Sequence, residues 1–144
     1  WNVAPDVAAV RARELIGWLG LEKVAHQRCE PFSRGMRQKV ALAGALVHDP
    51  KLIILDEPLT GLDAGSACLV KTVLTERVRA GCTVIMTTHI LEIAERMADR
   101  IGVIAGGRLV AEGTLQELRE RVGRGDSCLE ELFLTIVEQD AAVA

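Results

Sequence analysis

The chain has 144 residues, of which 49% are hydrophobic, and this content is enough for the core of one ordinary domain. Its 17 lysine and arginine residues against 20 aspartate and glutamate residues give a net charge of −3, so we expect no nucleic-acid partner. No apolar run approaches the roughly eighteen residues of a membrane span, and no signal segment opens the sequence. We therefore expect a cytoplasmic chain.

The first third of the sequence predicts two helices. Pro5 can start a helix with an apolar stripe, which Gly20 then ends. After a polar connector, Ser33 can cap a second helix that runs to about His48. The sequence begins with Trp1 rather than methionine and enters a helical pattern almost at once, so we expect it to be part of a longer protein.

Two apolar, β-branched runs predict a βαβ unit. Residues 52–55 and 83–88 are expected to be strands, with a helix over residues 64–80 between them. Four consecutive apolar residues in the first run favour a strand covered on both faces, as in a parallel sheet with flanking helices. Ligands of such sheets gather at the carboxyl ends of the strands, where Asp56 and Glu57 lie.

The last third predicts a helix over residues 91–98 and then a β-hairpin over residues 101–111, with a glycine pair at its turn. Residues 114–117 and 127–130 both have the S/T-x-x-E pattern of a capping box. We therefore expect two short C-terminal helices, capped by Thr114 and Ser127.

Asp56 and Glu57 can divide two tasks, because adjacent side chains on a strand point to opposite sides. One carboxylate can face a hydrated Mg²⁺ while the other addresses a water molecule. The alternative is that this acidic strand end merely caps the following turn. By itself the pair does not decide between the two.

The start of the second predicted helix can bind an anion. Its amide groups and partial positive charge suit a phosphate, Gly35 allows close backbone approach, and Arg34 adds charge. The alternative is that Ser33 is a plain N-cap. His89 follows the second strand at the same predicted edge of the sheet, although a lone histidine is more often structural. Asp63 is most simply the N-cap of the third helix.

Taken together, these segments resemble the ATP-binding domain of ABC transporters. Residues 32–38 resemble the signature motif, usually L-S-G-G-Q followed by x-Q, and residues 52–57 resemble the Walker B strand with its catalytic glutamate. Residues 60–63 resemble the D-loop, and His89 resembles the switch histidine. The resemblance implies an α/β fold: part of a P-loop NTPase core with a mostly parallel sheet and flanking helices.

The resemblance also implies three regions. Residues 1–49 are similar to the end of the helical subdomain with its signature helix. Residues 50–113 are similar to the nucleotide-binding core, including a hairpin, and residues 114–144 to the C-terminal helices of the same domain.

The resemblance assigns a role to each site residue. Asp56 would hold Mg²⁺ through water, Glu57 would orient or deprotonate the attacking water, and His89 would contact the γ-phosphate of ATP. Ser33 and the Gly35 amide would bind the ATP held by a second copy. The full set expected to bind the nucleotide is Ser33, Arg34, Gly35, Met36, Gln38 and Asp63.

The signature departs from the usual pattern at two positions. Arg34 stands where the family usually has its first glycine, and Met36 stands where it has glutamine. The G-M-x-Q form is similar to exporter-type and ABC-2-like ATPases. We therefore expect an ATP-hydrolysing subunit of an export transporter, which forms a head-to-tail dimer with a second ATP-binding domain and docks on transmembrane permease subunits at the cytoplasmic face of the membrane.

No G-x-x-x-x-G-K-[ST] phosphate loop occurs in the 144 residues. We expect this chain alone neither to bind ATP tightly nor to hydrolyse it. Two other functions remain open: a soluble ABC-type factor unconnected with transport, and a non-catalytic dimerisation or regulatory module. The coding sequence before Trp1 would separate these alternatives.

Overall fold

The structure is a computed structural model that describes residues 3–123 and 125–143. The chain divides into two compact units, Trp1–Thr87 and Thr88–Ala144, and each is described by itself. The first unit contains the elements α1 (Pro5–Trp18), η1 (Glu22–Val24), α2 (Arg34–Leu46), β1 (Leu52–Asp56), α3 (Ala64–Arg79) and β2 (Thr83–Thr87). The division into three regions at residues 49 and 113 stays a prediction.

The helices of the first unit begin where the sequence predicts. Pro5 occupies the first turn of α1, and Gly20 follows this helix with a φ of 65°. The Ser33 hydroxyl accepts a hydrogen bond from the Met36 N–H and caps α2. This helix ends at Leu46, slightly before the predicted end, and Asp49 then adopts a left-handed φ of 57°.

An ion-pair cluster fastens the turn between α2 and β1 to two helices. The Asp49 carboxylate lies 3.2 Å from the Arg11 guanidinium of α1 and 2.9 Å from that of Arg77 in α3. The Arg77 guanidinium also stacks over the Trp18 ring, 5.5 Å from its centroid. These contacts fix the position of the left-handed turn at Asp49, after which the chain enters β1.

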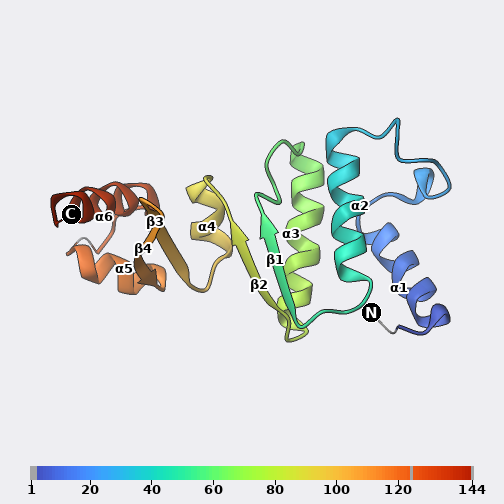
Figure 1. Cartoon of the computed structure of the whole chain (residues 1–144), viewed down its shortest axis with the longest axis horizontal. Helices are drawn as coiled ribbons and strands as arrows, with labels where there is room; N and C mark the ends of the chain where they lie inside the picture. Colours follow the sequence, from blue (N-terminus) through green and yellow to red (C-terminus); the bar gives the residue numbers. More distant parts are fainter. Residues whose placement is uncertain (1–2, 124, 144) are drawn as a thin grey trace. The chain divides into compact units, whose positions relative to one another are not determined.

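β1 and β2 pair in parallel, in a register that runs from Leu52 opposite Thr83 to Asp56 opposite Thr87. Together with α3, which packs against β2, they form the predicted βαβ unit. Figure 1 shows the helices of this unit on one side of the two strands. The core between helices and strands includes the fully buried side chains of Leu15, Leu19, Leu46, Val70 and Leu74.

The prediction that β1 is covered on both faces is wrong for the described residues. Ile53 is 4% exposed, whereas Ile54 on the opposite face is 70% exposed, and its neighbour Ile85 in β2 is 52% exposed. The reason is that the helices of this unit lie on one side of the two strands, and the burial of Ile53 identifies its face as the covered one. The apolar run of β1 therefore behaves as a one-sided strand here.

The second unit is a hairpin with three helices. Its elements are α4 (Leu91–Met97), β3 (Ile101–Ala105), β4 (Arg108–Gly113), α5 (Leu115–Val122) and α6 (Leu129–Val143). The strands pair antiparallel, and Gly106 and Gly107 at the turn have φ values of 53° and 75°, as a type I′ turn requires. The core consists of Ile101, Val103, Ala111, Leu118, Leu129, Leu132 and Ile136.

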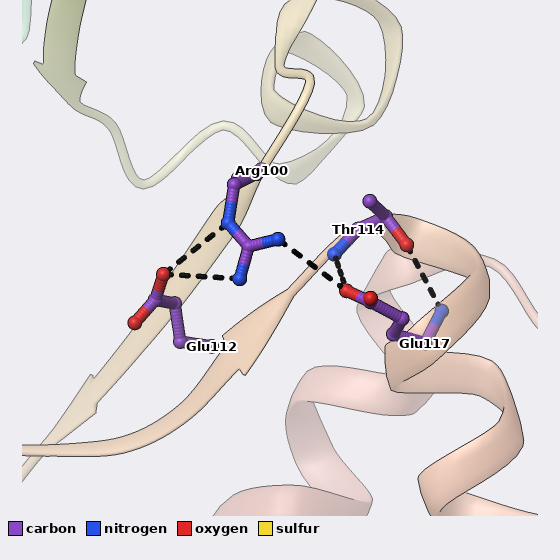
Figure 2. Close-up of polar contacts among 4 residues, drawn as sticks. All are labelled: Arg100, Glu112, Thr114 and Glu117. Atoms are coloured by element: carbon purple, nitrogen blue, oxygen red, sulfur yellow. Dashed lines mark hydrogen bonds and ion pairs between the residues drawn. The ribbon is translucent and has the colours of Figure 1, made fainter.

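The predicted capping box of α5 is present. The Thr114 hydroxyl accepts from the Glu117 N–H at 3.2 Å, and the Glu117 carboxylate accepts from the Thr114 N–H at 2.7 Å. Figure 2 shows Arg100 bridging this carboxylate, at 3.6 Å, to Glu112 of β4, at 3.2 Å. The Thr114 N–H, and to a smaller extent Arg100, hold the pKa of Glu117 below its ordinary value.

The prediction that Ser127 caps the last helix is wrong. α6 begins at Leu129, and the Leu129 N–H donates to the Glu95 carboxylate of α4 at 3.2 Å. Arg119 of α5 lies 3.3 Å from the same carboxylate and donates to the Ser127 carbonyl. A side chain distant in sequence therefore caps this helix in place of a local box.

Across residues 3–123 and 125–143, no helix combines the length and the apolar character that crossing a membrane requires.

Candidate active site

The first turn of α2 presents its amide groups at one end of the first unit. Ser33 has an extended backbone, and its Oγ lies 3.2 Å from the Met36 nitrogen that it caps. Ser33 is therefore the N-cap of α2. An N-cap hydroxyl also lies beside the unpaired amides of the first turn, so its predicted role in binding phosphate stays open.

Asp56 is the last residue of β1 and is exposed at the carboxyl end of the strand. Its Oδ1 accepts a hydrogen bond from the Thr87 hydroxyl at the end of β2. The parallel register places these two residues directly opposite each other. The expectation that the ends of the two strands lie side by side is thus confirmed for Asp56 and Thr87.

Glu57 leaves the strand through a left-handed turn. Its φ is 47°, a conformation that residues other than glycine adopt rarely, and one that costs about 1–3 kcal/mol. Its N–H donates to the Thr87 carbonyl at 3.2 Å and lies 3.3 Å from the Thr87 hydroxyl. The sequence predicts that Asp56 and Glu57 alternate along an extended strand. Glu57 instead has a left-handed backbone, and this twist separates the two carboxylates.

The loop after Glu57 is fastened to α2 by Gln38. Its side-chain amide nitrogen lies 3.3 Å from the Glu57 carbonyl oxygen and 2.5 Å from that of Pro58. Pro58 is buried. The Gln38 amide thus supports the backbone of the site, which adds a structural task to its predicted place in the nucleotide-binding set.

Two successive residues of the signature segment also touch this loop. A Cβ built on Gly61 would lie 3.2 Å from the Arg34 guanidinium carbon, and Gly61 has a φ of 75°. A Cβ built on Gly35 would lie 3.2 Å from a methyl group of Leu62. Both glycines therefore allow the first turn of α2 and the loop to approach closely.

Asp63 ends this loop and starts α3. Its carboxylate accepts from the Ser66 N–H at 2.9 Å and from the Ser66 hydroxyl at 2.7 Å. The first of these bonds is the main reason that the pKa of Asp63 lies below its ordinary value. The prediction that Asp63 is the N-cap of the third helix is confirmed. Its role across a dimer seam stays a prediction.

His89 belongs to the second unit, two residues after the end of β2. It is exposed, and the neighbouring Thr88 hydroxyl accepts from the Ile90 N–H before α4 begins. Its predicted contact with a γ-phosphate stays a prediction.

The donor set of the first unit suits magnesium bound with a nucleotide. No cluster of three or more acidic, histidine or cysteine side chains able to hold a metal occurs within the described ranges. Mg²⁺ does not need such a cluster, since it binds through one or two carboxylates together with water and substrate phosphates. An exposed carboxylate at Asp56, hydrogen-bonded to the Thr87 hydroxyl, matches this mode.

Two residues of the site have roles that the sequence alone does not assign. Thr87 touches both Asp56 and Glu57, and Thr60 donates its hydroxyl to the Glu57 carboxylate at 2.7 Å. A parallel register of the two strands is the signal that identifies Thr87. The Thr60 contact depends on the left-handed turn at Glu57, for which the sequence holds no signal.

Fold and site together define an α/β unit with two carboxylates at the end of β1 beside a helix N-terminus, and its structural neighbours are ATP-binding domains of the P-loop NTPase type. Residues 3–60 match the family model described as ABC transporter.

Curated relatives and solved structures agree with this class. The ABC-type transporter ATP-binding protein EcsA of Bacillus subtilis is 41% identical over 110 residues, which are 76% of this chain and 44% of that protein. The Nod factor export ATP-binding protein I of Rhizobium leguminosarum is 44% identical over 76% of this chain and 35% of that protein. A solved ATP-binding subunit of an ABC transporter has a TM-score of 0.88 at 31% identity, covering 94% of this chain and 56% of that one.

The chain therefore carries part of an ABC transporter ATP-binding domain. It spans less than half the length of these two curated relatives.

Proposed function

We propose that the protein containing this chain is the ATP-hydrolysing subunit of an ABC-type transporter that works in export. The observation that carries this proposal is the packing of the Glu57–Asp63 loop on the first turn of α2, through Gln38, Arg34 and Gly35. This packing places a carboxylate for water activation next to a helix N-terminus for phosphate. The export-type signature, Gly35-Met36-x-Gln38, and a relative named for Nod factor export support the direction of transport.

In this mechanism the two acidic residues act separately. Asp56 would hold Mg²⁺, with Thr87 orienting the carboxylate, and the ion would supply neutralisation of charge on the triphosphate. Glu57 accepts a hydrogen bond from the attacking water and takes its proton. The left-handed turn between them lets one carboxylate face the metal and the other the water.

The first turn of α2 serves the ATP held by a second ATP-binding domain. Ser33 and the Gly35 amide bind the γ-phosphate, Arg34 and Met36 line the same turn, and electrostatic stabilisation by such preorganised donors is a major part of catalysis. His89 contacts the γ-phosphate, and Asp63 acts across the seam of the head-to-tail dimer. The 144 residues contain no G-x-x-x-x-G-K-[ST] motif, so we propose that this stretch alone does not turn over ATP.

The partners in this proposal are the second ATP-binding domain and transmembrane permease subunits. The protein is then peripheral at the cytoplasmic face of the membrane. Relatives named as transporter ATP-binding proteins support this assignment.

ATP turnover by the full-length gene product that carries this sequence tests the proposal. We expect Mg²⁺-dependent hydrolysis that Asp56→Asn lowers by about 10²–10³-fold, a range typical of losing one key electrostatic group. Asp6→Asn, at the exposed start of α1, is the matched control and should leave the rate unchanged. The isolated 144-residue chain should be inactive.

Two outcomes would count against the proposal. Absence of ATP turnover in the full-length product would favour the non-catalytic module. Turnover that stays unchanged when the product is reconstituted with transmembrane permease subunits would favour a soluble ABC-type factor.

A further inference from the structure

Thr60 binds Glu57 at two points. Its hydroxyl donates to Oε2 of the Glu57 carboxylate at 2.7 Å, and its backbone N–H donates to the Glu57 carbonyl at 3.2 Å. The Thr60 side chain is half-buried, so this hydrogen bond is partly sheltered from bulk water. A short hydrogen bond to a carboxylate is among the stronger neutral-to-charged contacts in proteins.

The backbone of Glu57 is already fixed before Thr60 is considered. Its N–H is held by Thr87 at the end of β2, and its carbonyl oxygen by Gln38 of α2. The left-handed φ of 47° is maintained by these contacts. The Thr60 hydroxyl acts instead on the side chain of Glu57, whose rotation decides where the carboxylate points.

We propose that Thr60 is a positioning residue for Glu57, which orients the water-activating carboxylate by fixing its Oε2 oxygen. This inference rests on the proposed function, in which Glu57 activates the attacking water. A general base must lie within hydrogen-bond reach of the proton that it takes, so loss of its orientation lowers the rate of the chemical step.

The same loop links this hydroxyl to the signature turn. The residue after Thr60 is Gly61, which lies against the Arg34 guanidinium at the start of α2. The orientation of the Glu57 carboxylate thus depends on a loop that is supported by the helix predicted to bind the partner's ATP.

Two substitutions at Thr60 in the full-length gene product separate orientation from packing. Thr60→Val keeps the shape of the side chain and removes the hydroxyl, and Thr60→Ser keeps the hydroxyl. Thr72→Val is the matched control, because the Thr72 hydroxyl donates only to the Cys68 carbonyl one turn earlier on the exposed face of α3. Steady-state ATP hydrolysis gives kcat and KM for each variant, and thermal unfolding confirms that each is folded.

We expect Thr60→Val to lower kcat by about 10- to 100-fold, the cost of misplacing a catalytic group, with KM for ATP changed by less than about twofold. Thr60→Ser should restore at least about half of kcat, and Thr72→Val should match the wild type. Added to Glu57→Gln, Thr60→Val should cause no further loss, since it acts through that carboxylate.

A wild-type kcat in Thr60→Val, a serine variant as slow as the valine variant, or a change confined to KM would each overturn the inference. The variant Glu57→Gln distinguishes this failure from failure of the proposed function. If Glu57→Gln abolishes turnover and Thr60→Val does not slow it, only the role of Thr60 is wrong. If Glu57→Gln hydrolyses ATP at the wild-type rate, the water-activating role of Glu57 is wrong, and if the wild type itself does not hydrolyse ATP, the proposed function is wrong.

Discussion

The side-chain amide of Gln38, in α2, donates to the carbonyl oxygen of Pro58 with 2.5 Å between nitrogen and oxygen. The same amide lies 3.3 Å from the carbonyl oxygen of Glu57. Gln38 and Pro58 are 20 residues apart in sequence. Their contact joins α2 to the loop beside Glu57, the residue proposed to activate water. The position of Glu57 therefore depends on the helix that carries the signature segment.

Replacing Gln38 by leucine tests this dependence on stability. Gln38→Leu keeps a similar size and removes both hydrogen bonds, so the half-buried carbonyl oxygen of Pro58 loses its donor and that of Glu57 keeps the Thr60 N–H. We expect the free energy of unfolding to fall by about 1–3 kcal/mol, as for other unsatisfied buried acceptors. Urea denaturation measures this change.

The matched control is Gln116→Leu, on the exposed face of α5, where the amide donates to Glu120 in the next turn. Gln116→Leu should change the free energy of unfolding by no more than about 0.5 kcal/mol. Equal effects of the two substitutions would show that Gln38 does not support the loop.

Gly61 is predicted to tolerate no side chain, for two separate reasons. Its φ of 75° strains any L-residue, and a Cβ would meet the Arg34 guanidinium at 3.2 Å. We expect Gly61→Ala to lower the free energy of unfolding by more than about 1 kcal/mol. Chemical denaturation of the variant measures the combined cost of the backbone strain and the contact with Arg34.

Gly81→Ala measures the cost of the backbone strain alone, because Gly81 has a φ of 88° and an added Cβ would lie in open space. Gly61→Ala should cost more free energy of unfolding than Gly81→Ala does. This extra loss should diminish when Arg34 is replaced by alanine, since the guanidinium is then absent. An equal cost of Gly61→Ala in both backgrounds would contradict the contact with Arg34.

The capping carboxylate of Asp63 predicts a pH-dependent contribution to stability. Its pKa is lowered in the folded state, mainly by the Ser66 N–H, so its stabilisation is present above the unfolded pKa and is lost as pH falls through the folded one. We expect the difference in free energy of unfolding between wild type and Asp63→Ala to be largest near pH 7 and to narrow as pH falls below about 4, where the carboxylate becomes protonated. Free energies of unfolding measured across this range check the narrowing.

Asp63→Asn supplies the control, because it keeps a capping oxygen without a titrating charge. The difference in free energy of unfolding between Asp63→Asn and Asp63→Ala should not narrow at low pH. If it narrows as much as the difference between wild type and Asp63→Ala does, another group is responsible for the pH dependence.

Local features of the sequence predict the elements and several caps. Ser33, Asp63 and Thr114 each bind an N–H within three residues, so their sequence spacing is sufficient to identify them. Glu95, which caps α6 from another helix, leaves no such pattern, and a local capping box at Ser127 competes with it in the sequence.

The environment of Glu57 is beyond sequence reasoning for a similar reason. Its left-handed backbone is maintained by Thr87 and Gln38, which come from a different strand and a different helix. An apolar run cannot report how many of its faces are covered in a given chain. For this reason the exposure of Ile54 differs from expectation although its strand is correctly predicted.

The central claim is that Glu57 activates the water that attacks ATP. Hydrolysis and binding of ATP, measured together in the full-length gene product with Glu57→Gln, test it most directly, with Glu130→Gln on the exposed face of α6 as the control. The account predicts that Glu57→Gln lowers the hydrolysis rate by about 10²–10⁴-fold, the usual contribution of a general base, while ATP binding is retained. A Glu57→Gln variant that hydrolyses ATP as fast as the control would contradict it.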